Sequence, residues 1–132
     1  MENKEILENL VKTNLLPLAF IGDSVHTLFV RHKVLEHFNS KMENYHLTAS
    51  KFCKASHQAK VIKKLLDEKL LSPVEEDIVR RGRNAKPKHQ AKNSTSADYS
   101  YATSFEILVG YLYLSDDNER LEKILNFSME EN

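Results

Sequence analysis

The chain has 132 residues, 41% of them hydrophobic, and its 19 Lys and Arg side chains balance its 19 Asp and Glu side chains. This length and composition predict a single domain over residues 1–132 and exclude a disordered chain. The lone Cys53 excludes an internal disulfide framework and a cysteine-based zinc site, and no apolar run approaches the ~20 residues of a membrane span. We therefore expect a protein of the reducing cytoplasm with no membrane partner. Zero net charge also argues at first against nucleic acid, because domains that bind it often have a pI above ~9.

The neutral total conceals a segregated charge. Segment 80–92 holds six Lys and Arg and no acid, whereas the remainder has 13 bases and 19 acids. Segment 80–92 therefore has a net charge of +6, which a net charge of −6 on the rest of the chain cancels. Because local charge density decides where a polyanion docks, nucleic acid stays a candidate partner.

Helical spacing of apolar residues predicts the first four elements, over about 4–12, 17–37, 43–54 and 56–68. The second begins at Pro17, a residue favoured in the first turn of a helix. Its apolar positions, Leu28 and Leu35 included, keep the helical period and are expected to form one face.

Three more helices are predicted in the second half of the chain. The fifth opens on a capping box with Ser72 as N-cap and Glu75 at the third position, and it is expected to end near Gly82. A long polar and basic loop follows over 83–99. The sixth helix, over about 99–114, is apolar nearly all round and should be buried, and the seventh, over about 118–129, is amphipathic. No β-alternation appears, so the predicted class is an all-α bundle of about seven helices.

Two carboxylates interrupt the most apolar stretches of the chain. Asp23 follows Ala-Phe-Ile-Gly in the second predicted helix, and Glu106 lies within Ser-Phe-Glu-Ile-Leu-Val-Gly in the sixth. A buried carboxylate needs an ionic partner, a metal ion or access to water, and either acid taken singly could simply face solvent or pair with an Arg. If the two helices cross, both acids could face one Mg²⁺, which typically takes one or two protein carboxylates and keeps several waters. Such an ion near a basic surface suits phosphodiester hydrolysis.

Three stretches resemble one family. Leu-Ala-Phe-Ile-Gly-Asp-Ser-Val over 18–25 resembles the signature helix of the ribonuclease III family. Ser-Phe-Glu-Ile-Leu-Val-Gly-Tyr-Leu-Tyr-Leu over 104–114 resembles its second catalytic helix, and Arg-Arg-Gly-Arg-Asn-Ala-Lys over 80–86 resembles the basic loop motif of the Mini-ribonuclease III branch. The resemblance extends over about 15–125, and the length leaves no room for a double-stranded-RNA-binding domain.

This resemblance implies a homodimeric, all-helical endonuclease that uses Mg²⁺, with Mn²⁺ as a substitute, to cut double-stranded RNA. It implies 5′-phosphate and 3′-hydroxyl ends and a 23S ribosomal RNA precursor as substrate, and it leaves open whether a ribosomal protein stimulates the reaction. Carried onto this chain, Asp23 and Glu106 become the expected metal ligands and catalytic residues, and Phe20 the aromatic residue of the dimer interface. The expected RNA-binding residues lie in the basic loop, over about 80–98: Arg80, Arg81, Arg83, Asn84, Lys86, Lys88 and Lys92.

The sequence departs from the longer ribonuclease III enzymes, which carry a second acid one turn before each of these two. Ala19 and Thr103 occupy those places here. The reduced set is usual in the Mini-ribonuclease III branch, and it should weaken metal binding in the absence of RNA. It also leaves two alternatives open: a catalytically inactive module of the same fold that binds double-stranded RNA, and a helical adaptor whose basic loop meets an acidic protein.

For several other polar residues the sequence leaves two alternative roles open. His26, three residues after Asp23, is expected to be structural or exposed, with contact to a metal-bound water as the alternative. Lys60, Lys63 and Lys64 share one polar helix face that is either only solvated or an extension of the basic surface. Tyr101, near the end of the basic loop, is expected to be a core or interface aromatic residue, with RNA contact as the alternative.

Overall fold

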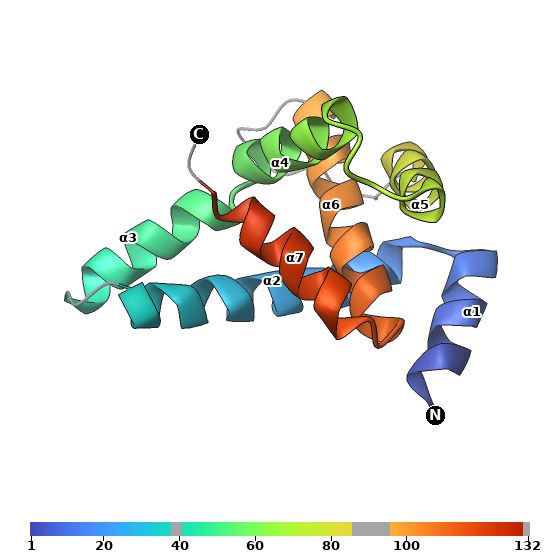
Figure 1. The fold of residues 1–132 in the computed structure, drawn as a ribbon, viewed down its shortest axis with the longest axis horizontal. Coiled ribbons are helices and arrows are strands. Elements are labelled where there is room, and N and C mark those ends of the chain that lie inside the picture. The colour runs from blue at the N-terminus through green and yellow to red at the C-terminus, as the bar shows by residue number, and fades with distance from the viewer. Residues whose placement is uncertain (38–40, 86–95, 131–132) are drawn as a thin grey trace.

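The computed structural model describes residues 1–37, 41–85 and 96–130, and these residues form seven helices and no strand (Figure 1). The helices are α1 (Asn3–Thr13), α2 (Leu16–His37), α3 (Met42–Cys53), α4 (Ala55–Asp67), α5 (Pro73–Asn84), α6 (Ser96–Leu114) and α7 (Asn118–Ser128). The all-α prediction is confirmed. The largest difference in a helix start is at α6, which begins about one turn before the predicted position. Within the described ranges, no helix combines the length and the apolarity needed to cross a membrane.

Helix α6 is the centre of the domain. It packs most extensively against α2, then against α4 and α5, and it also contacts α1 and α7. In Figure 1 it runs steeply across α2, with α1 and α5 on one side of the molecule and α3 at the far end of the other. A helix covered on so many sides needs apolar residues around its whole circumference, and α6 is buried at Phe105, Ile107, Leu108 and Val109. The prediction of a buried sixth helix is confirmed.

The apolar side chains form three clusters around this centre. The largest joins α4, α6 and α7, where α4 contributes Val61, Ile62 and Leu65. The second cluster joins four helices: α1, the start of α2, α5 and α6. The third cluster joins the end of α2 to α3 through Val30 and Phe52. Burial of about twenty such side chains at ~1.5–3 kcal/mol each is the main force holding the helices together.

The start of α5 is fixed by the predicted capping box. The Ser72 hydroxyl accepts from the Glu75 backbone N–H (3.2 Å), and the Glu75 carboxylate accepts from the Ser72 N–H (2.8 Å). The same carboxylate accepts two hydrogen bonds from the Arg120 guanidinium, at 2.9 and 2.7 Å, which ties α5 to α7. Burial would raise the pKa of Glu75, but the bonds from Arg120 and Ser72 outweigh it and leave that pKa below its usual value.

Three local predictions are wrong. Gly82 is not the residue after α5 but lies inside it, against Ser104 and Ile107 of α6, and the helix continues to Asn84. Leu28 and Leu35 do not share the buried face of α2, because they are 72% and 66% exposed. Helix α2 has 22 residues and carries apolar side chains on two faces, of which α6 and α3 cover only one.

The basic segment is also not wholly a loop. Arg80, Arg81, Arg83 and Asn84 lie on the last turns of α5, where the helix positions their side chains. Lys86, Lys88 and Lys92 lie outside the described residues.

Candidate active site

The carboxyl groups of Asp23 and Glu106 meet where α2 crosses α6. Asp23 lies in the second turn of α2 and is exposed, although it follows an apolar stretch of the sequence. Glu106 lies in the middle of α6 and is partly buried. Burial raises the pKa of Glu106 to about 9, and Asp23 contributes to this rise through a hydrogen bond and its negative charge. The two acids therefore form one pair, and in the absence of a cation Glu106 keeps its proton at neutral pH.

Two glycines allow the helices to approach closely enough for this pair to form. A Cβ on Gly22 would lie 1.8 Å from the backbone oxygen of Glu106, and a Cβ on Gly110 would lie 2.0 Å from the backbone oxygen of Leu18. The two backbones are therefore in direct contact, and any larger residue would separate them. Gly22 precedes Asp23 and faces the backbone of Glu106, so the contact fixes the two acids relative to each other.

His26 lies in the core beside the acid pair. It is fully buried, its Nδ1 is 3.3 Å from the side-chain nitrogen of Gln58 on α4, and its ring meets Phe105 edge to face at 4.9 Å. Among the described residues no group hydrogen-bonds to its Nε2. Burial and the charge of His57 lower the pKa of His26 to about 4, although Asp23 acts in the opposite direction. The imidazole is therefore neutral at pH 7, which agrees with the structural reading of His26.

The pair suits a divalent cation that keeps part of its water shell. Within the described ranges no group of three or more His, Cys, Asp and Glu side chains is placed to hold a metal ion, so the two carboxylates are the donor set. Mg²⁺ needs no more than this, because it is bound through one or two carboxylates and retains several waters. Thr103, in a position where longer family members carry an acid, is buried and supplies none, and Ala19 is partly covered.

The basic residues at the end of α5 have different surroundings. Arg80 is exposed and pairs with Asp77 one turn earlier, whereas Arg81 is partly buried and donates to the backbone oxygen of Val11 on α1. Arg83 lies over the ring of Tyr101, 4.1 Å from its centroid. Asn84 is exposed. Arg80, Arg83 and Asn84 are thus open to a ligand, while Arg81 also joins α5 to α1.

Tyr101 connects α5 to the lysines of α4. The Arg83 guanidinium lies 4.1 Å from the centroid of the Tyr101 ring, and the Lys63 ammonium lies 4.9 Å from it. Lys63 also pairs with Asp98 at 3.2 Å. Lys60 is exposed on the same face of α4. The structure thus places a basic surface from α5 across α6 to α4. The structure favours the second interpretation of these lysines, an extension of the basic surface, over solvation alone, and nothing in the spacing indicated that Tyr101 lies between two cations.

An apolar stripe follows the exposed face of α2. Phe20 is 82% exposed, and Leu28 and Leu35 continue the same face toward the end of the helix. Exposed apolar side chains in a row, as opposed to single ones, are typical of an interaction surface.

Comparisons with known proteins agree with this arrangement. A family model described as "Ribonuclease III domain" matches residues 16–117. The chain is 43% identical to a Mini-ribonuclease 3 of Thermoanaerobacter sp. (strain X514), with 98% of this chain and 92% of the relative covered. It is 35% identical to a Mini-ribonuclease 3 of Staphylococcus aureus (strain NCTC 8325 / PS 47), with 96% and 93% covered. A crystal structure of a Fusobacterium nucleatum protein, 26% identical, has a TM-score of 0.77 to it and covers 89% of this chain and 93% of its own. The chain therefore belongs to the ribonuclease III family of endoribonucleases.

Proposed function

We propose that the chain cuts double-stranded RNA in a divalent-cation-dependent reaction centred on Asp23 and Glu106. The family acts on double-stranded RNA. The observation that carries the proposal is the meeting of these two carboxylates at the crossing of α2 and α6, on a domain whose α5 ends in a basic surface.

The two acids bind the proposed cation, Mg²⁺ or Mn²⁺, as two different kinds of ligand. Glu106 is held by its partial burial and by the contact of its backbone with Gly22, so its carboxylate is the fixed ligand. Asp23 is exposed, and we propose that it meets the arriving substrate. A divalent cation held there favours attack of water on the phosphodiester and stabilises the departing 3′ oxygen. We expect 5′-phosphate and 3′-hydroxyl ends on the products.

The basic surface holds the duplex. Arg80, Arg83 and the α4 lysines Lys60 and Lys63 can contact phosphates, and Lys86, Lys88 and Lys92 are proposed to continue the surface outside the described residues. Such contacts position an A-form duplex by its shape and charge and carry little base-sequence information directly.

The stripe of Phe20, Leu28 and Leu35 is proposed to be the face of a two-fold dimer. A two-fold axis duplicates every site, so a dimer through α2 would present one acid pair to each RNA strand. Asp23 lies on the same helix as the stripe, one turn after Phe20, so a second copy seated there would lie beside the acid pair.

The finer substrate assignment rests on the resemblance of the sequence to the Mini-ribonuclease III branch. We propose that the natural substrate is a 23S ribosomal RNA precursor, cut in the cytoplasm, and that a ribosomal protein stimulates the reaction. Mapping the cut positions on transcribed precursor RNA, with and without ribosomal proteins, measures both.

Replacing either acid by its amide tests the site. Asp23→Asn and Glu106→Gln keep the shape and remove the charge, so we expect each to reduce the cleavage rate of a structured RNA by about a hundredfold or more in Mg²⁺ buffer. The thermal unfolding temperature should not fall, because neither charge supports the core. Gel electrophoresis of end-labelled RNA measures the rate.

The control is Glu119→Gln, which removes an acid of similar type from an exposed position on α7. It should cut at the native rate. Native rates in Asp23→Asn or Glu106→Gln would show that the site is elsewhere, and a change in RNA mobility without a change in RNA length, in the native protein, would favour a binding module without activity.

A further inference from the structure

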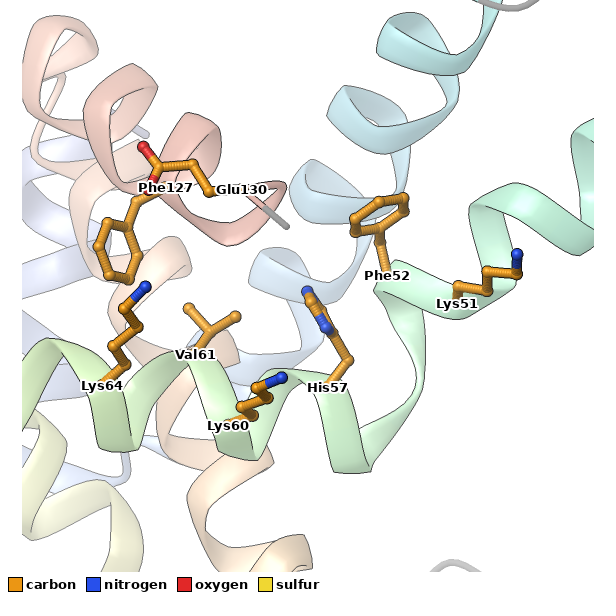
Figure 2. Close-up of a pocket in the computed structure, with 8 residues that line it drawn as sticks. All are labelled: Lys51, Phe52, His57, Lys60, Val61, Lys64, Phe127 and Glu130. Atoms are coloured by element: carbon orange, nitrogen blue, oxygen red, sulfur yellow. The ribbon is translucent and has the colours of Figure 1, made fainter. Parts of the chain in front are cut away.

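A cavity of about 460 Å³ opens between α3, α4 and α7, and neither acid of the pair lines it (Figure 2). Its walls and floor are apolar, formed by Phe52 of α3, Val61 of α4 and Phe127 near the end of α7. Figure 2 shows the space between the ring of Phe127 on one side and the rings of Phe52 and His57 on the other, with Val61 below. The volume lies within the usual range of small-molecule sites, about 300–1,000 Å³.

The cavity is preformed by contacts among its own walls. The ring of His57 meets Phe52 edge to face at 5.3 Å, and its Nε2 donates to the backbone oxygen of Ser128 at 2.6 Å. These contacts join the start of α4 to α3 and to α7. A ligand would therefore not have to order the walls before it binds, which lowers the entropic cost of binding.

Positive charge surrounds the apolar floor. Lys51, Lys60 and Lys64 line the cavity, and Glu130 supplies the one carboxylate that the described residues place there. Lys64 also pairs with Glu68 at 3.9 Å. The Lys64 ammonium lies 5.3 Å from the centroid of the Phe127 ring. Lys51 and Lys60 are exposed, and no acid of the described residues pairs with either. Within the part of the chain that the structure describes, these two ammonium groups can therefore receive anions at the edge of the apolar cavity.

An apolar slot with aromatic walls and lysines at its edge matches one nucleotide of a single strand. Proteins hold single strands by placing bases against aromatic rings and phosphates against basic side chains. A duplex cannot use the slot, because its bases are stacked inside the helix. An acidic peptide could pair with the lysines, but the position of the cavity favours RNA, because Lys60 and Lys64 also lie on the α4 face that continues to Lys63, Tyr101 and Arg83. That face also carries Asp98 and Glu68, which pair with Lys63 and Lys64, so Lys60 is the lysine on it that the cavity shares without an acid partner among the described residues.

We propose that this cavity receives one unpaired nucleotide of the RNA strand that flanks the duplex, with the base between the aromatic rings and the adjoining phosphates on Lys51 and Lys60. The inference rests on the proposed function, since it takes RNA as the substrate. It adds a selection rule: an RNA in which a single-stranded extension adjoins the duplex is bound in preference to a blunt duplex.

Fluorescence anisotropy in EDTA buffer, where no cutting occurs, tests the rule. The probes are a blunt RNA duplex, the same duplex with a short adenosine extension at the 3′ or at the 5′ end, and the extended duplexes with abasic riboses in place of the adenosines. We expect one extended duplex to bind about tenfold more tightly than the blunt one. The abasic extension should lose most of this preference, because it keeps the phosphates and removes the base.

The protein variants assign the preference to the cavity. Lys51→Gln/Lys60→Gln should lower the ratio of extended to blunt affinity to about one. The matched control Lys4→Gln/Lys12→Gln removes two exposed lysines from α1 and should keep the native ratio. All four positions are exposed, and thermal unfolding checks that the fold is retained.

Three results would overturn the inference while the blunt duplex still binds: no preference for either extension, an equal preference for the abasic extension, or a native ratio in Lys51→Gln/Lys60→Gln. If neither extension is preferred, a peptide of Glu and Phe residues serves as a second probe. Binding of this peptide to the native protein but not to Lys51→Gln/Lys60→Gln would assign the cavity to a protein partner. Failure of the blunt duplex to bind at low salt would count against the proposed function itself.

Discussion

The two carboxylates of the candidate site differ in surroundings although they meet. Asp23 is exposed, whereas burial and the charge of Asp23 raise the pKa of Glu106 to about 9. Two carboxyl groups at such a short separation cannot both ionise without a large electrostatic cost, so the pair carries a proton until another positive charge replaces it. A divalent cation meets that need, and the pair is therefore better suited to a cation than to a purely structural role.

His26 makes the stability of the fold depend on pH. Its pKa is about 4 in the folded protein and 6.5 in an ordinary setting, so in the pH range between these values the unfolded chain binds a proton that the folded chain does not. The stability that depends on neutral His26 should therefore decrease by ~2–3 kcal/mol as the pH is lowered from about 6.5 to 4, and it should be fully present above pH 7. Glu106, whose pKa is raised to about 9, acts in the opposite direction over the same range, so the effect of His26 is measured against a variant that lacks it. Urea unfolding at pH 7 and pH 5, at fixed protein concentration, measures the difference.

The His26→Gln variant supplies the comparison, because its amide can still pair with Gln58 and does not titrate. The change in unfolding free energy on going from pH 7 to pH 5 should therefore be more favourable to the folded state in this variant than in the native protein. His46→Gln, which removes an exposed histidine of α3, should behave as the native protein does. An equal pH dependence in His26→Gln and the native protein would show that other groups cause it.

At the scale of elements, the crossing of α2 and α6 rests on the reciprocal contacts of Gly22 and Gly110. Replacing Gly22 by Ala places a methyl group on the backbone of Glu106, and a backbone cannot rotate away as a side chain can. We expect Gly22→Ala to destabilise the fold by about 3 kcal/mol or more and to lower cleavage activity even in the molecules that fold. Urea unfolding and the cleavage rate at low temperature measure the two effects.

Gly82→Ala is the matched control. Its methyl group would first meet Cδ1 of Ile107 at 3.1 Å, the end of a side chain that can move. Because Ala favours a helix interior over Gly by about 0.5–1 kcal/mol, the net change should stay within about 1 kcal/mol. Similar losses in both variants would mean that the contact at Gly22 is not special.

The helices themselves are predictable, because each carries its own signal. The capping box of Ser72 and Glu75 locates the start of α5 from residue types and spacing alone, and the unbroken apolar run around Phe105 identifies the buried helix. The signals fail where the outcome depends on a distant segment. Gly82 is typical of a helix end, yet it lies inside α5 because α6 approaches it too closely for most side chains.

The candidate site is predictable in its residue types and not in its geometry. Asp23 and Glu106 stand out because acids are rare in apolar stretches, and spacing cannot tell that one of them faces solvent. The contact of Gly22 with the backbone of Glu106 joins residues far apart in sequence, so it depends on the packing of whole helices. The position of Tyr101 between Arg83 and Lys63 is hidden from the sequence for the same reason.

At the scale of the whole molecule, charge placement should decide RNA binding. Lys86→Gln/Lys88→Gln/Lys92→Gln removes half of the +6 of segment 80–92, so we expect much weaker RNA binding and a salt dependence whose log–log slope is shallower by about three. Anisotropy titrations at several salt concentrations measure both. Lys4→Gln/Lys12→Gln/Lys123→Gln changes the net charge by the same amount on exposed faces of α1 and α7 and should have a small effect. Equal losses would mean that total charge matters and its placement does not.

The proposed dimer is also tested at this scale. Phe20→Asp places a charge in the exposed stripe of α2, so the variant should sediment as a monomer at concentrations where the native protein is a dimer. Val74→Asp, which alters an exposed apolar residue on α5, should leave the mass unchanged. A dimer that persists in Phe20→Asp would show that the subunits associate through another face.

The backbone contact between α2 and α6 also bears on how the protein loses activity. Both acids lie on helices that pack in the core, and neither acid can move away from the other unless α2 and α6 separate. Opening of the acid pair should then require nearly as much free energy as opening of the domain, unlike the cheap local fluctuations that disperse a loop-borne site. Heating or denaturant should therefore inactivate the molecule and unfold it in a single event, with no folded but disassembled state between them.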